Sequence, residues 1–336
     1  MSATLKELAG ELGLSVSTVS RVLNGKGVFS EETRRRILEA AEKFDYAPNA
    51  FARSLREQSY HAIGLMVPNV TNPYYSSILE KVEEECQRAG YTLLIGVSNF
   101  NVGREKHFVD YLMSNQVNGM ILASHDSDEE VMRILARGLQ VVSLNEHKQE
   151  VCFNWVAIDN RKAMFDLTQY MINQHHRNIA CMHGDRNNID NITAEMRKCG
   201  YMECMAQNHL EIRPEMVIPA GLTYATGREA ARQLICQRQM PTAIVCHNNE
   251  IAAGAYDALK EAGFDIPGDV SIACFDSIVP RQIIGKQFTA IVQPLDKICH
   301  QAIRILIEGN DAGETATKVR FPYVFIKGET TRRCKN

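Results

Sequence analysis

Short apolar segments alternate with amphipathic helical stretches from about residue 61 to the end of the chain, and this rhythm limits the fold to one class. The segments lie at residues 62–67, 92–97, 119–124, 140–145, 178–184, 242–248 and 270–276. Their length and their β-branched residues favour strands, and a stretch of helical periodicity follows each of them. They form two βαβ series, which predict an α/β fold with two lobes, each a parallel sheet covered by helices on both faces.

The composition is that of a globular protein with room for two or three domains. The chain has 336 residues, of which 45% are hydrophobic and 23% charged, and its formal net charge is -3. No stretch approaches the roughly 18 unbroken apolar residues of a membrane span. The N-terminus has no basic segment followed by an apolar run. We therefore expect a cytoplasmic protein with no membrane partner.

The ten cysteines are scattered singly, without a CxxC pair, and several lie inside apolar segments such as IACMHG and SIACFD. This pattern is typical of small buried hydrophobic residues in a reducing compartment. It argues against zinc and disulfide sites. We expect no metal site and no cofactor.

The first sixty residues predict three short helices with a tight turn between the first two. Thr4 and Glu7 form a capping box at the start of the first helix, and Gly13 ends it. Ser15 is a good N-cap for the second helix, and Ser30 begins the third. This pattern over residues 1–47 predicts a helix-turn-helix head.

The second of these helices has a polar face that suits DNA. Four apolar residues recur at helical spacing and should pack on the other two helices: Val16, Val19, Val22 and Leu23. The outer face then presents Ser17, Ser20, Arg21 and Asn24. An arginine on such a helix can pair with guanine in the major groove, and the face has no carboxylate that phosphate would repel. The alternative is that this surface is the solvated face of a plain three-helix bundle. Net charge does not decide between the two interpretations, because residues 1–60 hold nine Lys/Arg against eight Asp/Glu.

Residues 48–60 contain a segment that can form under two turns of helix after Pro48. A helix this short is marginal in water, so it should fold only against a surface. Ala52 and Leu55, flanked by Arg53 and Arg56, suit a minor groove, where apolar side chains enter a base step and arginines follow the phosphates. The alternative is a plain linker between domains.

Polar and aromatic side chains follow the predicted strands, at the edge where parallel sheets bind ligands. They are Asn69, Thr71, Asn72, Tyr74, Tyr75, Asn145, Glu146, Asn191, Thr193, Arg197, Asn248, Asn249 and Asp276. An aromatic pair, an arginine, an aspartate and several amides are what a polyhydroxylated ligand needs. Each residue singly could instead be a helix cap or part of the core.

The sequence lacks the motifs of several common enzyme classes. We find no phosphate loop, no GxGxxG after a strand, no GxSxG and no HExxH. His175 and His176 lie at a predicted helix end, where histidines interact with the helix dipole more often than with a metal. We therefore expect a binding protein and not an enzyme.

The segment LSVSTVSRVLNGKGVFSEETRRRILEAAEKFDYAPNAFARSLR resembles the DNA-binding head and hinge of the LacI/GalR family of bacterial transcription regulators. Further segments extend the resemblance over essentially the whole chain: VPNVTNPYY, AIDNRKA, MRKCGY and HNNEIAAGAYDALKEAGFDIPGDVSIACFD. The resemblance implies a periplasmic-binding-protein-like sensor over residues 61–336. Its first lobe would comprise about 61–159 and 293–321, and its second lobe about 160–292 and 322–332.

The resemblance also implies roles for residues of the head and the hinge. Base edges would be read by Val16, Ser17 and Arg21. Phosphates would lie near Thr4, Ser15, Thr18, Ser20 and Asn24. The minor-groove hinge would use Ala52, Arg53 and Leu55, with Leu55 as the wedge. The implied assembly is a homodimer, or a tetramer, on a pseudo-palindromic operator in double-stranded DNA, with the protein in the bacterial cytoplasm and associated with the nucleoid.

For the sensor, the resemblance implies an effector site between the lobes. Its residues would be Tyr74, Tyr75, Asn145, Asp159, Asn191, Thr193, Arg197, Leu222, Asn248 and Asp276. Leu222 stands where several relatives carry an aromatic residue, so a flat purine ring would lose one stacking partner. We therefore favour a sugar or sugar derivative as effector of a repressor, with a purine or nucleoside as the alternative. A sugar-binding or sugar-processing α/β protein without a DNA role is the rival from another class.

Overall fold

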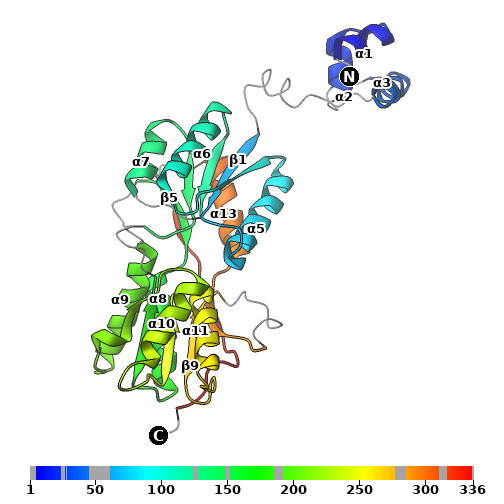
Figure 1. Cartoon of the computed structure of the whole chain (residues 1–336). Coiled ribbons are helices and arrows are strands. Elements are labelled where there is room, and N and C mark those ends of the chain that lie inside the picture. Colours follow the sequence, from blue (N-terminus) through cyan, green and yellow to red (C-terminus); the bar gives the residue numbers. More distant parts are fainter. Residues whose placement is uncertain are drawn as a thin grey trace. The chain divides into compact units, whose positions relative to one another are not determined.

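The computed structural model describes residues 5–23, 27, 29–44, 61–123, 128–147, 152–184, 192–276, 285–309 and 316–334. The chain divides into two compact units, one within residues 1–60 and the other within residues 61–336 (Figure 1).

The smaller unit contains the three predicted helices. They are α1 (Leu5–Leu12), α2 (Val16–Leu23) and α3 (Glu31–Lys43). Gly13 follows α1 in the left-handed region, with φ of 63°, which glycine adopts without strain. Ser15 caps α2, because its Oγ accepts a hydrogen bond from the Thr18 backbone N–H at 3.1 Å, and Ser30 caps α3 in the same way. Leu8, Val19 and Ile37, one from each helix, are fully buried in a common core.

The first lobe of the larger unit contains a six-stranded sheet. Its strands are β1 (Ala62–Val67), β2 (Thr92–Val97), β3 (Gly119–Leu122), β4 (Val141–Ser143), β5 (Asn154–Ala157) and β11 (Lys318–Arg320). Their order is β11-β5-β4-β3-β1-β2, and every neighbouring pair is parallel, as the alternating pattern predicts.

Helices cover both faces of this sheet (Figure 1). They are α5 (Pro73–Ala89), α6 (Val102–Ser114), α7 (Asp128–Ala136) and α13 (Leu295–Glu308). Ile63 and Leu65 of β1 share a buried cluster with residues of α5 and α13. Gly64 lies between them on the opposite face, where a Cβ would lie 2.4 Å from Leu112 of α6. Alternate residues of one strand therefore face different helix layers.

The second lobe repeats this plan. Its strands are β6 (Ile179–His183), β7 (Val217–Pro219), β8 (Ala243–Cys246), β9 (Ser271–Phe275), β10 (Thr289–Val292) and β12 (Val324–Ile326), in the order β12-β10-β9-β8-β6-β7. All neighbours are parallel except β12, which runs antiparallel to β10.

Two pairs of helices cover the second sheet. They are α8 (Asn160–Asn173) with α9 (Ile192–Gln207), and α10 (Tyr224–Ile235) with α11 (Asn249–Glu261). Both strand faces are buried, which explains why β6, β8 and β9 are continuously apolar apart from terminal His183 and Ser271. Helices α10 and α11 cross closely at Gly227 and Gly254. A Cβ at Gly254 would lie 2.1 Å from the carbonyl oxygen of Tyr224.

The end of the chain is fixed to the second lobe by buried hydrogen bonds. Thr330 donates from Oγ1 to the carbonyl of Ile272 at 2.7 Å. His176, which is 2% exposed, donates from Nε2 to the carbonyl of Arg332 at 3.0 Å, and its Nδ1 lies 2.9 Å from Thr242 Oγ1. His176 is therefore a structural contact of this lobe.

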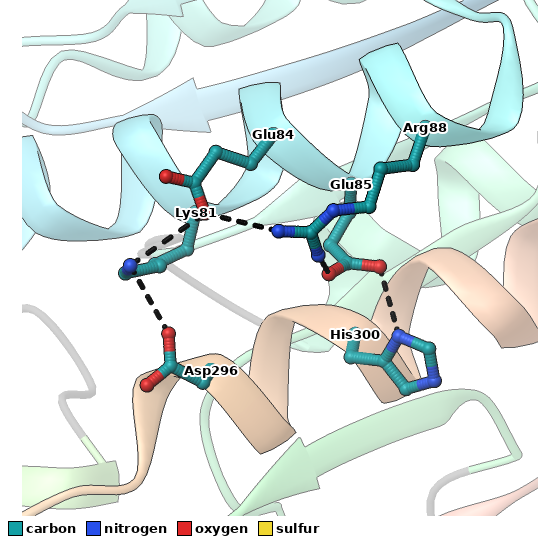
Figure 2. Close-up of polar contacts among 6 residues, drawn as sticks. All are labelled: Lys81, Glu84, Glu85, Arg88, Asp296 and His300. Carbon is teal, nitrogen blue, oxygen red and sulfur yellow. Dashed lines mark hydrogen bonds and ion pairs between the residues drawn. The ribbon is translucent and has the colours of Figure 1, made fainter.

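Ion pairs join α5 to α13 on the first lobe. Figure 2 shows the cluster of Lys81, Glu84, Glu85, Arg88, Asp296 and His300. Lys81 Nζ lies 3.2 Å from Asp296 Oδ1, and His300 Nδ1 lies 2.8 Å from Glu85 Oε2. Exposed pairs of this kind contribute little to stability. The buried cluster that includes Ile78 and Val82 of α5 and Ile298 and Ala302 of α13 holds the two helices together.

Candidate functional site

A cavity lies between the two lobes, where the carboxyl ends of strands from both sheets meet. Its lining residues are Asn69, Asn72, Tyr74, Tyr75, Phe100, Asn145, Asn160, Thr193, Arg197, Leu222, His247, Asn248, Asn249, Asp276 and Gln293. These residues come almost entirely from the segments that directly follow strands. This is the edge at which open parallel sheets bind ligands.

Arg197 of α9 is the central cation of this cavity, and it is only 4% exposed. Its Nε donates to Asn160 Oδ1 at 2.9 Å, and its Nη1 donates to the carbonyl of His247. The guanidinium lies over the ring of Phe275, 3.6 Å from the centroid. Burial lowers the pKa of Arg197, and the negative charge of Asp276 opposes that shift. The guanidinium is therefore fixed in place by three described neighbours.

Asp276 supplies the opposite charge, directly after β9. Its backbone has φ of 57°, in the left-handed region, where aspartate is one of the few side chains found. Its N–H donates to the carbonyl of Ile291 at 2.8 Å, and its Oδ2 accepts from Gln293 Nε2 at 3.0 Å. Burial raises the pKa of Asp276, and Arg197 opposes this. The left-handed backbone at Asp276 places its carboxylate on the cavity lining.

Two tyrosines form the aromatic part of the lining. Asn72 caps α5 by accepting from the Tyr74 N–H at 3.0 Å, and Pro73 begins the helix. This start places Tyr74 and Tyr75 on the cavity with ring centroids 5.2 Å apart in an edge-to-face arrangement. Burial first, and then Asp276, raise the pKa of Tyr74 well above its ordinary value of 10.0. Its hydroxyl is therefore a neutral hydrogen-bonding group at physiological pH.

Most of the predicted effector-binding residues lie on this cavity. They are Tyr74, Tyr75, Asn145, Thr193, Arg197, Leu222, Asn248 and Asp276. Asn191 lies outside the described residues. Asp159 is not among the described lining residues, and its Oδ1 caps α8 by accepting from the Lys162 N–H at 2.8 Å. The next residue, Asn160, enters the cavity instead.

Asn248 lies on the cavity, but its side chain already serves the fold. Its Oδ1 caps α11 by accepting from the Ile251 N–H at 2.8 Å. Its Nδ2 donates to the carbonyl of Leu222 at 3.1 Å. The amide therefore fixes the start of α11 and the Leu222 segment.

Four further lining residues were not among the predicted site residues: Phe100, Asn160, His247 and Gln293. His247 lies near the end of the predicted segment 242–248 and directly after β8, which ends at Cys246, so the rule that useful residues follow strands could have found it. Gln293 follows β10, a strand that the sequence pattern did not predict. Asn69, Asn72 and Asn249 also line the cavity, and the sequence pattern had named them among the polar side chains that follow strands and suit a polyhydroxylated ligand.

In the smaller unit, those residues predicted to meet DNA that the structure describes lie on α2 and in the turn before it. Ser15, Ser17 and Arg21 are exposed, and Thr18 is half-buried. Ser15 Oγ lies 2.8 Å from the hydroxyls of both Ser17 and Thr18, which makes a connected patch of hydroxyl groups. An arginine one turn further along completes a polar surface on this helix.

Two details of α2 differ from expectation. Ser20 does not lie on the outer face, since it is 5% exposed, and Val16 does not pack in the core, since it is 42% exposed. Ser20 is small enough to lie among the buried residues Val19 and Val22, whereas Val16 is the first residue of the helix. The predictions for Thr4, Asn24, Ala52, Arg53 and Leu55 lie outside the described residues.

Within the described ranges, no cluster of three or more histidine, cysteine, aspartate or glutamate side chains could hold a metal ion. Over the same part of the chain, no helix has the length and apolar character needed to span a membrane. The charged side chains among the described lining residues are Arg197 and Asp276, and the rest are amides, aromatic rings, a threonine, a leucine and a histidine. This chemistry suits non-covalent binding of a small polar ligand.

Comparison with known proteins agrees with this description. Residues 4–49 match the model of bacterial regulatory proteins of the lacI family, and residues 60–329 match that of periplasmic binding proteins and the sugar-binding domain of the LacI family. The chain is 31% identical over 316 residues to the HTH-type transcriptional repressor CytR of Escherichia coli (strain K12), covering 91% of this chain and 89% of that protein. It is 29% identical over 307 residues to catabolite control protein A of Priestia megaterium, covering 91% and 92%.

A solved structure of the lac repressor dimer, bound to operator and the anti-inducer ONPF, has the same fold. Its TM-score is 0.86 at 20% identity, and the match covers 99% of this chain and 100% of that chain. The chain belongs to the LacI family of bacterial regulatory proteins, and it is a DNA-binding transcriptional repressor with an effector-binding sensor domain.

Proposed function

We propose that the protein is a cytoplasmic repressor whose affinity for its operator is controlled by a sugar or sugar derivative bound in the cavity between the lobes. The observation that carries this proposal is the charge and polarity of the lining. One buried arginine and one buried aspartate lie among amides and aromatic rings. Such a set balances charge and offers paired donors and acceptors to vicinal hydroxyls.

A neutral ligand fits this cavity better than an anionic one. Arg197 already donates to Asn160 and to the carbonyl of His247, and Asp276 lies close enough to oppose the shift in its pKa. An anion would have to compete with that carboxylate. Leu222 on the lining also offers a purine ring no stacking face, which favours a sugar over a nucleobase.

The cavity is connected to each of the three chain segments that pass between the lobes. Asn160, in the first connection, accepts from Arg197. Gln293, in the second, donates to Asp276. Arg320, which begins the third, pairs with buried Glu146, and Glu146 Oε2 also accepts from the Asn160 N–H at 3.3 Å.

We infer that the effector changes the angle between the lobes through these contacts. A ligand that touches residues of both lobes is bound with different affinity at different lobe angles. It can shift the population only by that difference in affinity. The lobe angle would then determine whether the segment at residues 48–60, with Leu55 as its wedge, can enter the minor groove in both protomers.

We further propose a homodimer formed through the first lobe. Strand β2 is an edge strand of its sheet, and Ile95 and Val97 are 47% and 40% exposed on it. An exposed edge strand with apolar side chains is suited to a partner surface. Two heads in such a dimer would meet two half-sites of a pseudo-palindromic operator.

On the operator, we assign base reading to Val16, Ser17 and Arg21. All three are exposed on α2. Val16 could contact a thymine methyl group, and Arg21 could bind guanine through two hydrogen bonds. Ser15 and Thr18 would lie near phosphates.

The test combines duplex selection with an effector panel. Full-length protein selects duplexes from a random-sequence pool, and a shift assay at fixed salt then measures affinity for the selected duplex. Neutral mono- and disaccharides, nucleosides, free purine bases and sugar phosphates are added one at a time. The proposal expects a neutral sugar to change the affinity at least tenfold. A response confined to purine bases or nucleosides would overturn the sugar assignment, and failure to select any duplex would overturn the operator role.

A further inference from the structure

The segment that joins β8 to α11 carries buried polar atoms with no protein partner. Within the described part of the chain, His247 Nδ1 and both amide atoms of Asn249 make no hydrogen bond. His247 is 5% exposed and Asn249 is fully buried. Both residues line the cavity between the lobes. A buried donor or acceptor without a partner is costly in a folded protein, so three such atoms beside one cavity require an explanation.

Asn248, which lies between His247 and Asn249, has a structural role at this turn. Both polar atoms of the Asn248 side chain are used, one to cap α11 and one to bind the carbonyl of Leu222. The fold at this turn is thus already satisfied by Asn248. His247 and Asn249 are left to provide hydrogen-bonding groups for another molecule.

The position of His247 is set by its neighbours. Its N–H donates to the carbonyl of Met182 at 2.9 Å, and its carbonyl accepts from Arg197. Its ring lies against Gly184, where a Cβ would come within 2.9 Å of the ring Cδ2 and within 2.9 Å of Leu222 Cδ2. Glycine at 184 therefore leaves room for the imidazole beside Leu222 on the cavity lining.

The chemistry of this ring suits a hydroxyl group. Burial, Arg197 and His183 lower the pKa of His247 well below its ordinary value of 6.5, so the imidazole is neutral at physiological pH. A neutral imidazole has one N–H and one lone pair. A hydroxyl can satisfy either nitrogen, because it both donates and accepts, and the Asn249 amide can likewise meet a donor and an acceptor at once.

We propose that His247 Nδ1 and the Asn249 side-chain amide bind hydroxyl groups of the effector, which makes His247 a specificity-determining residue for a neutral polyol. This inference rests on the proposed function, in which the effector is a sugar. It adds a second group of polar contacts, on the segment after β8, to the Arg197 and Asp276 pair.

The experiment is a thermodynamic cycle between side chain and hydroxyl. Isothermal titration of the full-length protein at pH 7.5 first measures binding of D-glucose, D-galactose, D-ribose and cellobiose. The tightest of these is then compared with its singly deoxygenated analogues, on the wild type and on His247→Ala. We expect one deoxy analogue to bind the wild type about tenfold or more weakly, which is the size expected when a buried polar group is left unpaired. His247→Ala should weaken binding of the parent sugar by a similar factor but bind that analogue without further loss.

Two isosteric variants identify the nitrogen involved. Asparagine can place a polar atom near Nδ1, whereas glutamine places one near Nε2, so His247→Asn should bind within about threefold of the wild type and His247→Gln should resemble His247→Ala. If His247→Ala fails to fold, as judged by circular dichroism, the cycle is run with His247→Gln. The matched control is His209→Asn, at an exposed position of the second lobe and not among the described lining residues, which should leave binding unchanged.

The outcomes separate the two proposals. Suppose that the wild type binds a sugar, and that removing any one hydroxyl from it weakens binding to His247→Ala by the same factor as binding to the wild type. The proposed His247 contact is then wrong, and the sugar-binding function stands. Binding by His247→Ala within twofold of the wild type has the same meaning. If the wild type binds none of the four sugars, the proposed effector class fails, and the His247 contact fails with it.

Discussion

Gln293 donates a hydrogen bond from Nε2 to Asp276 Oδ2 at 3.0 Å, and both side chains are buried beside the cavity. This bond joins the second connection between the lobes to the end of β9. Together with Arg197 and a backbone hydrogen bond from Gln293, it opposes the rise that burial causes in the pKa of Asp276.

Replacing Gln293 by leucine should therefore destabilise the protein and weaken effector binding. The variant leaves a buried carboxylate with one fewer donor, which costs about 1–3 kcal/mol for a hydrogen bond to a charged group. Urea unfolding at pH 7.5 measures the change. The control is Gln287→Leu at an exposed position, which should be close to neutral. Equal stability of the two variants would contradict the role given to the Gln293 contact.

Two buried histidines in the second lobe should make the free energy of unfolding depend on pH. Burial lowers the pKa of His247 well below 6.5, and that of His176 in the same direction. As the pH falls through 6.5, the unfolded chain takes up protons at these sites before the folded chain does. Each histidine should therefore lower the free energy of unfolding by up to about 1.4 kcal/mol per pH unit, from the unfolded pKa down to the folded one.

Urea unfolding at intervals between pH 7.5 and 5.5 tests this prediction. His247→Asn should reduce the loss of stability in acid, and the double variant with His176→Asn should reduce it further. An identical dependence on pH in all three proteins would show that neither histidine is kept neutral by the fold.

The close crossing of α10 and α11 predicts opposite results for the same substitution at two glycines. Gly254→Ala would place a Cβ 2.1 Å from the backbone carbonyl of Tyr224, so it should destabilise the sensor by about 1–3 kcal/mol or more. Gly10 lies in α1 with no atom within 4 Å of an added Cβ. Gly10→Ala should stabilise the head by about 0.5–1 kcal/mol. Thermal unfolding of each variant measures whether the substitution stabilises or destabilises the protein. A Gly254→Ala variant as stable as the wild type would contradict the described crossing.

The polar surface of α2 predicts which arginine carries sequence recognition. Arg21→Ala should weaken binding to the selected duplex by about 1–3 kcal/mol and bring its affinity closer to that for random DNA. Arg35 of α3 is also exposed and pairs with Glu39 at 3.7 Å. Arg35→Ala should change both affinities little and equally. Loss of specificity in Arg35→Ala but not in Arg21→Ala would overturn the assignment of the reading helix.

The sequence predicted the parts of the fold whose patterns are long or continuously apolar. Residues 62–67 and 92–97 form β1 and β2 with the bounds expected. Strands β5 and β11 were missed because they are short, and β5 contains an asparagine and a tryptophan. Strand β10 begins with a buried threonine that interrupts the apolar pattern.

Errors at the level of single residues have a common physical origin. Helical periodicity gives the direction of a side chain around the axis, but not how far along the helix its neighbours extend. Val16 fits the apolar periodicity of α2 but is the first residue of the helix, and it stays exposed, while small Ser20 is covered. In the same way, Asp159 and Asn160 both follow β5, and only the start of α8 determines which of them is the cap. Which side-chain atoms of His247 and Asn249 are left without a hydrogen bond in the described structure depends on packing, which the sequence pattern does not give.

In the proposed function, occupancy of the cavity controls operator affinity through Asp276 and its neighbours. The most direct measurement is a shift assay with the selected duplex, with and without the effector found by the panel, on the wild type and on Asp276→Asn. We expect the effector to change the affinity of the wild type at least tenfold. Asp276→Asn should bind the duplex as well as the unliganded wild type but respond less than twofold. A full effector response in Asp276→Asn, with unchanged effector affinity, would contradict it.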